Sequence, residues 1–212
     1  MKEFQDAAAG VAFGDLPIDE DGAVRRMYLQ LKSPEFQGLS FPVAMAEYFS
    51  DRQLQPGGSS YLLLGEEKIP LVTKEPDSAL IDFHTSFPAQ IVKVQDLLAT
   101  GFSPAIFSDK IVLVGQSSTF GKDAYNTPAF RFAIHTQNRA LLSGTEIHAA
   151  AITTLLSGRT MRILSPTSLW GLNFVLVLWI VTLVMRVRPL LAVAIVLLAI
   201  LSAGGLALIF FQ

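Results

Sequence analysis

The spacing of hydrophobic positions changes several times along the first part of the chain, as in a domain built from short strands and helices. Asp21-Gly22 favours a tight turn, and the residues after it predict a strand over 23–31. Residues 41–54 instead carry apolar side chains at helical spacing, with Pro42 suited to the first turn. A strand hairpin followed by an amphipathic helix is therefore expected.

The same reasoning predicts the remaining elements up to residue 162. Apolar runs predict a pair of strands within 57–72, a buried strand over 78–84 and a strongly apolar strand over 109–115. Helical spacing predicts a short helix over 92–100 and a longer helix over 145–156, with Gly158 as its end signal. We therefore expect an α/β fold, with a mixed sheet and helices packed on it.

The last fifty residues have a different pattern. Arg162 and Arg186 enclose 23 residues without a charge, and 22 further uncharged residues span 190–211. A bilayer core of about 30 Å needs about 20 apolar residues in a helix. The sequence therefore predicts a domain over 1–162 and, within 163–212, a hairpin of membrane helices at about 169–185 and 190–211.

The composition limits the classes of molecule that we expect the chain to bind. A formal net charge of −2 gives no reason to expect nucleic acid, and the absence of cysteine excludes disulfides and thiolate chemistry. The mean hydropathy of +0.45 instead favours a lipid bilayer as partner. Two arginines flank the first span on each side, so charge does not orient the hairpin. Residues 1–10 have no apolar core of a signal peptide, and none is expected.

The stretch "IVLVGQSSTFGKD" resembles the beginning of a phosphate-binding loop. Five residues separate Gly115 from Gly121, where such a loop has four, and Asp123 occupies the position of the metal-binding hydroxyl. We therefore interpret the segment as a strand and a turn. Asp123, Asn126 and Thr127 follow the end of this strand, where α/β sheets place ligands, and are candidate ligand-binding residues. The same side chains also make turns by bonding to their own backbone.

The acidic run Asp19-Glu20-Asp21 raises the question of calcium. A calcium loop needs Glu at its twelfth position, and Gln30 stands there. A hairpin turn is the better interpretation, and we expect either Arg25 or Arg26 to pair with one of its acids.

His148 is a further candidate ligand-binding residue, although a structural histidine bonded to a carbonyl is the simpler interpretation. Glu146 precedes it by two positions, and side chains so spaced on a helix point apart. His84 and His135 have no partner at the spacing of a metal pair. We find no catalytic constellation and expect neither enzyme activity, nor a cofactor, nor a metal.

Six segments occur in a recognisable order: "DEDGAVRRM", "FPVAMA", "IDF", "DKIVLVG", "DAYNTP" and "GTEIHAAAITTLLSGR". Together with the apolar segments after them, they resemble the C-terminal part of the type-two CHASE domain, a sensory extracellular domain associated with cyclases and histidine kinases. The motif positions are Asp21, Gly22, Arg25, Gly115, Pro128, Gly144 and Glu146.

The resemblance implies an extracytoplasmic sensor, followed by membrane helices and by a cyclase or kinase effector. It places residues before Arg162 outside the cytoplasm of a multi-pass protein of the inner (plasma) membrane. The family's N-terminal portion and third membrane helix are not found, so we expect an interior piece, a truncated gene product or one chain of a split assembly.

Three functions stay open. The chain is a sensory module that responds to a small ligand or a protein signal, an enzyme at the membrane, or a non-catalytic membrane subunit that scaffolds a complex. Assembly as a homodimer or with other chains is expected in the first and third cases.

Overall fold

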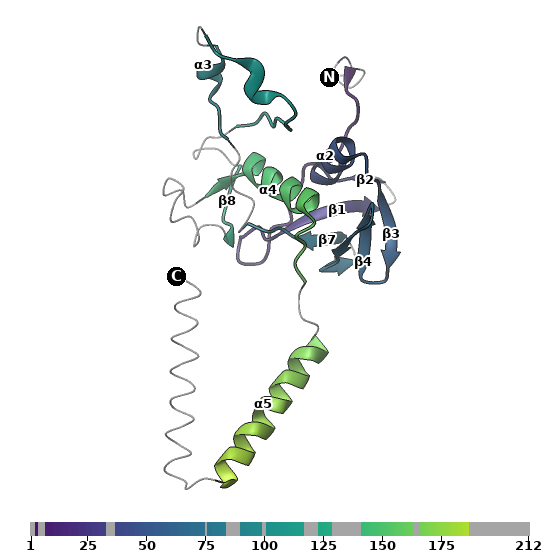
Figure 1. Cartoon of the computed structure of the whole chain (residues 1–212), viewed down its shortest axis with the longest axis vertical. Coiled ribbons are helices and arrows are strands. Elements are labelled where there is room, and N and C mark those ends of the chain that lie inside the picture. Colours follow the sequence, from purple (N-terminus) through teal and green to yellow (C-terminus); the bar gives the residue numbers. More distant parts are fainter. Residues whose placement is uncertain are drawn as a thin grey trace. The chain divides into compact units, whose positions relative to one another are not determined.

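A computed structural model describes residues 3, 7–32, 37–74, 76–83, 90–98, 101–116, 123–128, 141–162 and 166–186. The chain divides into two compact units, Met1–Arg162 and Ile163–Gln212. The first unit contains strands and helices, whereas the described part of the second is one helix (Figure 1).

The main sheet of the first unit is antiparallel, with strand order β2-β1-β7-β6. Its strands are β1 (Arg26–Lys32), β2 (Gln37–Leu39), β6 (Thr73–Lys74) and β7 (Asp77–Leu80). Met27 and Leu29 of β1 are buried, while Arg26, Tyr28 and Gln30, which alternate with them, are half-buried. This period of two gives the sheet one face toward the core.

Two smaller antiparallel sheets complete the strand structure. The first has the order β3-β4-β5, made of Leu54–Gly58, Tyr61–Leu64 and Glu67–Pro70. The second pairs β8 (Ala124–Tyr125) with β9 (Leu142–Ser143). The strands predicted within 57–72 are therefore confirmed as β4 and β5.

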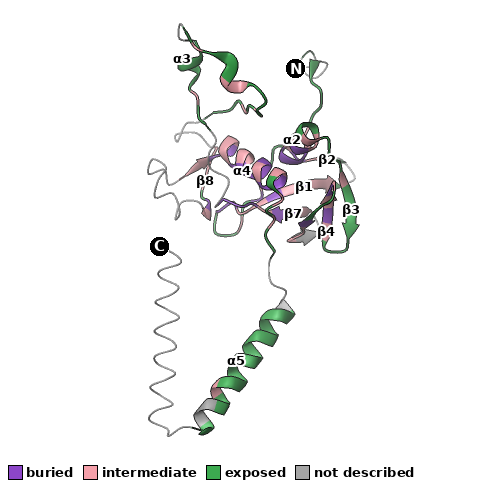
Figure 2. Ribbon diagram, in the orientation of Figure 1, coloured by how far each residue is buried: buried purple, intermediate pink, exposed green. Residues whose placement is uncertain are grey.

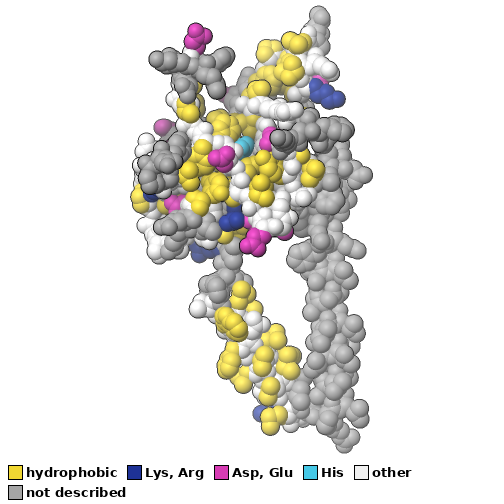
Figure 3. Space-filling model, turned by 180° about the vertical axis from the view of Figure 1, so that it is seen from behind, with side chains coloured by type: hydrophobic (Ala, Val, Ile, Leu, Met, Phe, Trp, Pro, Cys, Tyr) yellow, Lys and Arg dark blue, Asp and Glu magenta, His cyan; other side chains and the backbone are white. Residues whose placement is uncertain are grey.

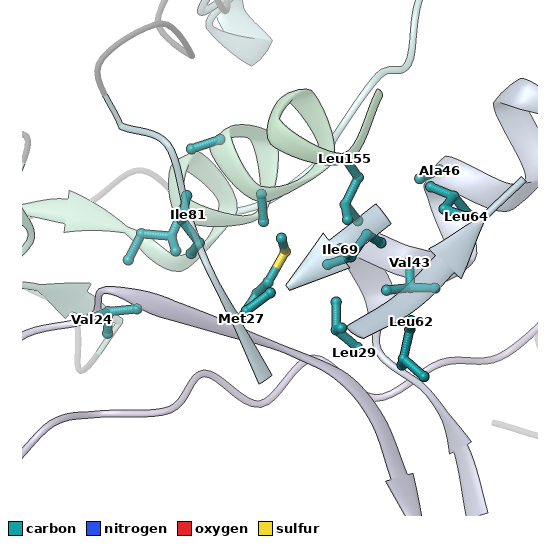
Figure 4. Packing of buried hydrophobic residues seen from close by; sticks show 14 of the residues in the cluster. Val24, Met27, Leu29, Val43, Ala46, Leu62, Leu64, Ile69, Ile81 and Leu155 are labelled. Carbon is teal, nitrogen blue, oxygen red and sulfur yellow. The ribbon is translucent and has the colours of Figure 1, made fainter. Parts of the chain in front are cut away.

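Helices α2 (Phe41–Ser50) and α4 (Gly144–Ser157) pack against each other and enclose the core with the strands. Figure 4 shows side chains from both helices and from β1, β4 and β5 pointing into one cluster. The residues labelled there are Val24, Met27, Leu29, Val43, Ala46, Leu62, Leu64, Ile69, Ile81 and Leu155. Both helices were predicted, and Pro42 does occupy the first turn of α2.

The short helices α3 (Val94–Leu97) and η1 (Pro104–Phe107) bury no residue. They are coloured mainly as exposed in Figure 2, unlike the buried faces of α2 and α4. The helix predicted over 92–100 is therefore present but shorter.

The strand predicted over 109–115 is wrong, because residues 111–116 form neither strand nor helix. Val112 is 48% exposed and Val114 is 92% exposed, so the segment is not a buried central strand. High β-propensity describes a side chain that suits a pleated, half-buried surface, and it does not supply the neighbouring strand that a ladder needs.

Two further predictions are corrected in part. The strand predicted over 78–84 ends at Leu80, although Ile81 and Phe83 are buried beyond it. The described strands pair antiparallel, and parallel pairing occurs among them only at isolated bridges such as Phe13 with Ser40. The α/β class is confirmed, with antiparallel sheets in place of a mixed one.

The second unit is described by α5 (Pro166–Arg186). Among the residues that the structure describes, no helix is both long and apolar enough to cross a membrane. The predicted membrane hairpin is therefore not confirmed, and its second segment, 190–211, lies outside the described residues.

Candidate functional site

Helix α4 begins with a complete capping box. The Ser143 hydroxyl accepts a hydrogen bond from the Glu146 amide at 3.3 Å, and the Glu146 carboxylate accepts from the Ser143 amide at 2.8 Å. The box satisfies backbone donors that would otherwise lack a partner in the first turn. Glu146, which the sequence placed in a motif, therefore fixes the position at which the helix begins.

Three distant segments meet this first turn. The Nε2 atom of His148 lies 3.1 Å from the carbonyl oxygen of Gly14. The carboxylate of Asp123 lies against Gly144, where a Cβ would come within 2.8 Å of an oxygen, and Gly115 lies still more tightly against the side chain of Thr145. We call Gly14, Gly115, Asp123, Gly144, Thr145 and His148 the α4 N-terminal site.

His148 is held as a neutral imidazole. A carbonyl can only accept, so Nε2 carries the proton and Nδ1 carries the lone pair. Nδ1 is buried and has no hydrogen-bond partner among the described residues. Burial lowers the pKa of His148 below its ordinary 6.5, opposed by the Gly14 carbonyl and the charge of Asp123. The ring also meets Phe41 edge-on, with centroids 5.3 Å apart.

Asp123 also acts on Tyr125 in β8. Burial raises the pKa of the Tyr125 hydroxyl, and the charge of Asp123, a hydrogen bond to it and the charge of Asp15 raise it further. The pairing of β8 with β9 places Ala124 opposite Ser143, immediately before α4. This two-stranded ladder therefore holds Asp123 next to the start of α4.

A cavity of about 530 Å³ adjoins this site. It is lined by Phe13, Gly14, Asp15, Leu16, Ile18, Tyr28, Leu31 and Tyr125. The three aromatic rings and one carboxylate that give it a distinct chemistry come from three segments that are far apart in the sequence. Sequence reasoning missed them, since no local spacing brings residues 13, 28 and 125 together.

The predicted hairpin lies beside the same region. Gly22 has a left-handed φ of 77°, and its amide donates to the Asp19 carbonyl at 2.9 Å, so the predicted turn is confirmed. The amide of Val24 donates to the carbonyl of Asn126 at 2.8 Å. The hairpin is thereby joined to the segment that carries Asp123.

Both arginines pair in this hairpin, so the expectation that one of them would do so is corrected. Arg25 contacts Asp19 at 2.9 Å and Asp21 at 2.6 Å, and Arg26 contacts the other oxygen of Asp19. The long side chains reach the turn from both faces of the strand. The hydrogen bond from Arg25 lowers the pKa of Asp21 to about 2. These acids thus have guanidinium partners and form an ion-paired turn.

The other candidate residues are placed as follows. Thr127 is buried and Pro128 is half-buried, at the end of the segment that begins with Asp123. His84, His135 and the Gly121-Lys122 pair lie outside the described residues. Within the described ranges, no group of three or more His, Cys, Asp or Glu could hold a metal ion. The arrangement is suited to holding one end of a helix in place.

Comparison with known proteins agrees with the motif order. No curated protein and no solved structure matches the chain significantly. The model of the CHASE2 domain family, however, matches residues 2–185, which include the hairpin, the α4 N-terminal site and α5. The chain therefore belongs to the CHASE2 domain family, a family of sensory extracellular domains in signalling receptors.

Proposed function

We propose that the chain senses an extracytoplasmic signal for a membrane-bound receptor, and that α4 passes this signal toward residues 163–212. One observation carries the proposal: segments around Gly14, Gly115 and Asp123 all contact the first turn of α4. A signal that moves any of them changes the support of this helix. It acts only through a difference in its affinity for two arrangements of the domain.

The far end of α4 supports the same role. Gly158 closes the helix with a left-handed φ of 66°, shortly before the unit boundary at Arg162. The hydroxyl of Thr160 donates to the carbonyl of Lys68 at 3.0 Å. The connection is short and anchored, so a displacement of α4 is not lost in a long linker.

The proposed membrane attachment rests on sequence and exposure. Large apolar side chains of α5 are exposed at six successive positions, residues 174–179, which point in all directions around a helix. Hydrophobic side chains of α5 are visible along its length in Figure 3. A helix that is apolar on every side needs lipid or protein around it. We assign this role to a bilayer, with α5 and 190–211 as a hairpin and Arg186 on the cytoplasmic side.

The effector in this proposal is a cyclase or kinase outside the 212 residues. A fusion of a further membrane helix and then an adenylate cyclase domain after Gln212, expressed in cells without their own cyclase, tests the coupling, because the hairpin alone would return the chain to the extracytoplasmic side. Asp123→Ala should change the basal cyclic AMP level at equal amounts of membrane-inserted protein, because it removes the acid against α4. Equal output from wild type, Asp123→Ala and Gly115→Ala would contradict the proposal.

A second candidate is a non-catalytic subunit that scaffolds a larger membrane complex. It is favoured by the exposed apolar side chains of Val94, Leu98 and Val114 on the first unit, which protein contacts would cover. Light scattering of the purified chain tests this candidate, because a scaffold should form assemblies larger than a dimer through this unit even when 163–212 is removed.

A further inference from the structure

We propose that the cavity beside the α4 N-terminal site binds a small organic cation: an amine or quaternary ammonium group on an apolar body. The proposal deepens the proposed sensory function by naming the ligand class, but binding at the cavity can be measured without any signalling output.

The charged side chains around the cavity favour a ligand with a positive charge. Asp15 is the one charged residue among the described residues that line it. Asp123 adds a second negative charge close to the wall, because both acids act on the hydroxyl of Tyr125. The arginines of the neighbouring hairpin, Arg25 and Arg26, are already paired with Asp19 and Asp21. The potential in the cavity is therefore negative, and an anionic ligand would be repelled.

The aromatic lining selects a cation of low hydration. Phe13 and Tyr28 face the cavity with ring centroids 6.2 Å apart and planes inclined by 50°, and Tyr125 adds a third ring. Aromatic rings attract cations through their negative faces, and sites that recognise ammonium groups are lined by several such rings. Leu16, Ile18 and Leu31 provide apolar surface for the rest of the ligand.

Tyr125 can orient the ammonium group as well. Asp123 lies close enough to the Tyr125 hydroxyl to raise its pKa, and a neighbouring carboxylate favours the protonated hydroxyl. The phenolic oxygen keeps lone pairs that can accept from an ammonium N–H. The size of about 530 Å³ lies in the range of small-molecule sites and suits a body of one ring or a short aliphatic chain.

The cavity is also connected to the helix. Gly14 lines it, and the carbonyl of the same residue accepts the hydrogen bond from His148 of α4. A ligand that fixes the Phe13-Gly14-Asp15 backbone therefore fixes one of the three supports of the first turn of α4. This link makes the cavity an entry point for a signal that reaches α4.

Titration calorimetry on the full chain in lipid nanodiscs tests the proposal, with empty nanodiscs to subtract partitioning. The probes are 2-phenylethylamine as the cation, 2-phenylethanol as its neutral analogue and 3-phenylpropionate as the anion. We expect saturable binding of the amine, at least fivefold weaker binding of the alcohol, and no binding of the anion. Equal affinities for the amine and the alcohol would overturn the proposal.

Matched variants locate the binding. Asp15→Asn should weaken amine binding about fivefold and leave the alcohol unchanged, and Tyr28→Leu should weaken amine binding by a similar factor. Glu20→Gln removes the same charge from an exposed residue outside the cavity lining and should have no effect. An equal loss of amine affinity in Asp15→Asn and Glu20→Gln would show that the amine is attracted only by the negative charge of the surface, and it would contradict the site.

Hydrogen exchange in α4 separates this proposal from the sensory one. Amine binding that slows exchange in the first turn of α4 supports both. Binding without any change in α4 supports the cation site and contradicts the coupling. Absence of amine binding contradicts the cation site, and the coupling is then tested by the cyclase fusion alone.

Discussion

The imidazole of His148 binds the backbone carbonyl of Gly14 at 3.1 Å, across 134 residues of sequence. The contact joins the first turn of α4 to the wall of the cavity. Burial favours the neutral ring and lowers the pKa of His148, although the hydrogen bond to Gly14 opposes this shift, and Nδ1 has no described partner that would stabilise a second proton.

Acid should therefore destabilise the first unit through His148. The unfolded chain has the higher histidine pKa, about 6.5, and takes up the proton first. This contribution is complete above that pH and is lost as the pH falls toward the lower pKa of the folded state. Thermal unfolding followed by near-ultraviolet circular dichroism between pH 7.5 and 5 measures the loss.

His148→Gln is the control, because it keeps an N–H donor and cannot titrate in this range. The variant should lose most of the pH dependence. The ion-paired acids do not interfere, since the pKa of Asp21 lies near 2 and its contribution is lost only as the pH falls through that value. An unchanged pH dependence in the variant would exclude His148 as its source.

Thr154→Val should destabilise the first unit more than Thr153→Val. The fully buried Thr154 hydroxyl accepts from the Asp82 amide at 3.0 Å and donates to the Ala150 carbonyl at 2.9 Å, so valine removes the partner of a buried donor. The expected loss is about 1–3 kcal/mol in the free energy of unfolding.

Thr153 is a matched position on the same helix, where the hydroxyl donates only to the Ala149 carbonyl at 2.8 Å. Its replacement by valine should change stability by less than about 0.5 kcal/mol. Urea denaturation of both variants makes the comparison, and equal losses would mean that the Asp82 contact contributes nothing.

Local signals explain what the sequence could predict of this fold. Pro42 begins α2 and Gly158 ends α4, and both act within one turn of the residues that they affect. The strand expected over 109–115 depended on a partner, which local composition does not encode. The long buried helix was therefore easier to predict than the most β-prone segment of the chain.

The candidate site also combines features that local sequence signals predict with features that depend on long-range contacts. Asp123 and His148 were singled out separately, and the β8–β9 ladder explains why the acid reaches the start of α4 and influences the histidine. The cavity could not be derived, because Phe13 and Tyr125 come together only through the tertiary fold. The residue types identified candidate site residues, whereas contacts between distant segments determined which of these residues lie together.

Gly144 and Asp123 should show a coupling that changes sign. A Cβ at Gly144 would come within 2.8 Å of the Asp123 carboxylate, so Gly144→Ala should destabilise the native chain by displacing it. In an Asp123→Ala background the same change should stabilise α4 by a few tenths of a kcal/mol, because alanine favours a helix over glycine. A double-mutant cycle by urea denaturation gives the interaction energy. Additive effects would show that the two residues do not meet in solution.

The hairpin should depend on Asp19 more than on its exposed neighbours. Asp19 contacts both Arg25 and Arg26, and its side chain is only 21% exposed. Asp19→Ala should lower the free energy of unfolding by about 1 kcal/mol, as expected for a network rather than a single surface pair. Glu20→Ala, at an exposed position of the same turn, should have no measurable effect. The difference should shrink in 1 M salt, and equal losses would contradict the network.

The connection after α4 offers the most direct test of signal transfer. Gly158 ends the helix and the Thr160 hydroxyl donates to the Lys68 carbonyl, so the chain is still held to the first unit shortly before the boundary at Arg162. A Gly-Ser-Gly-Ser segment inserted after Gly158 adds flexible backbone that can absorb a helix displacement. In the cyclase fusion it should abolish the difference in output between wild type and Asp123→Ala, while membrane pelleting stays unchanged. The same insertion after Gly101, in a segment outside this path, serves as the control and should preserve the difference. If the difference survives the insertion after Gly158, α4 is not the route by which the domain communicates.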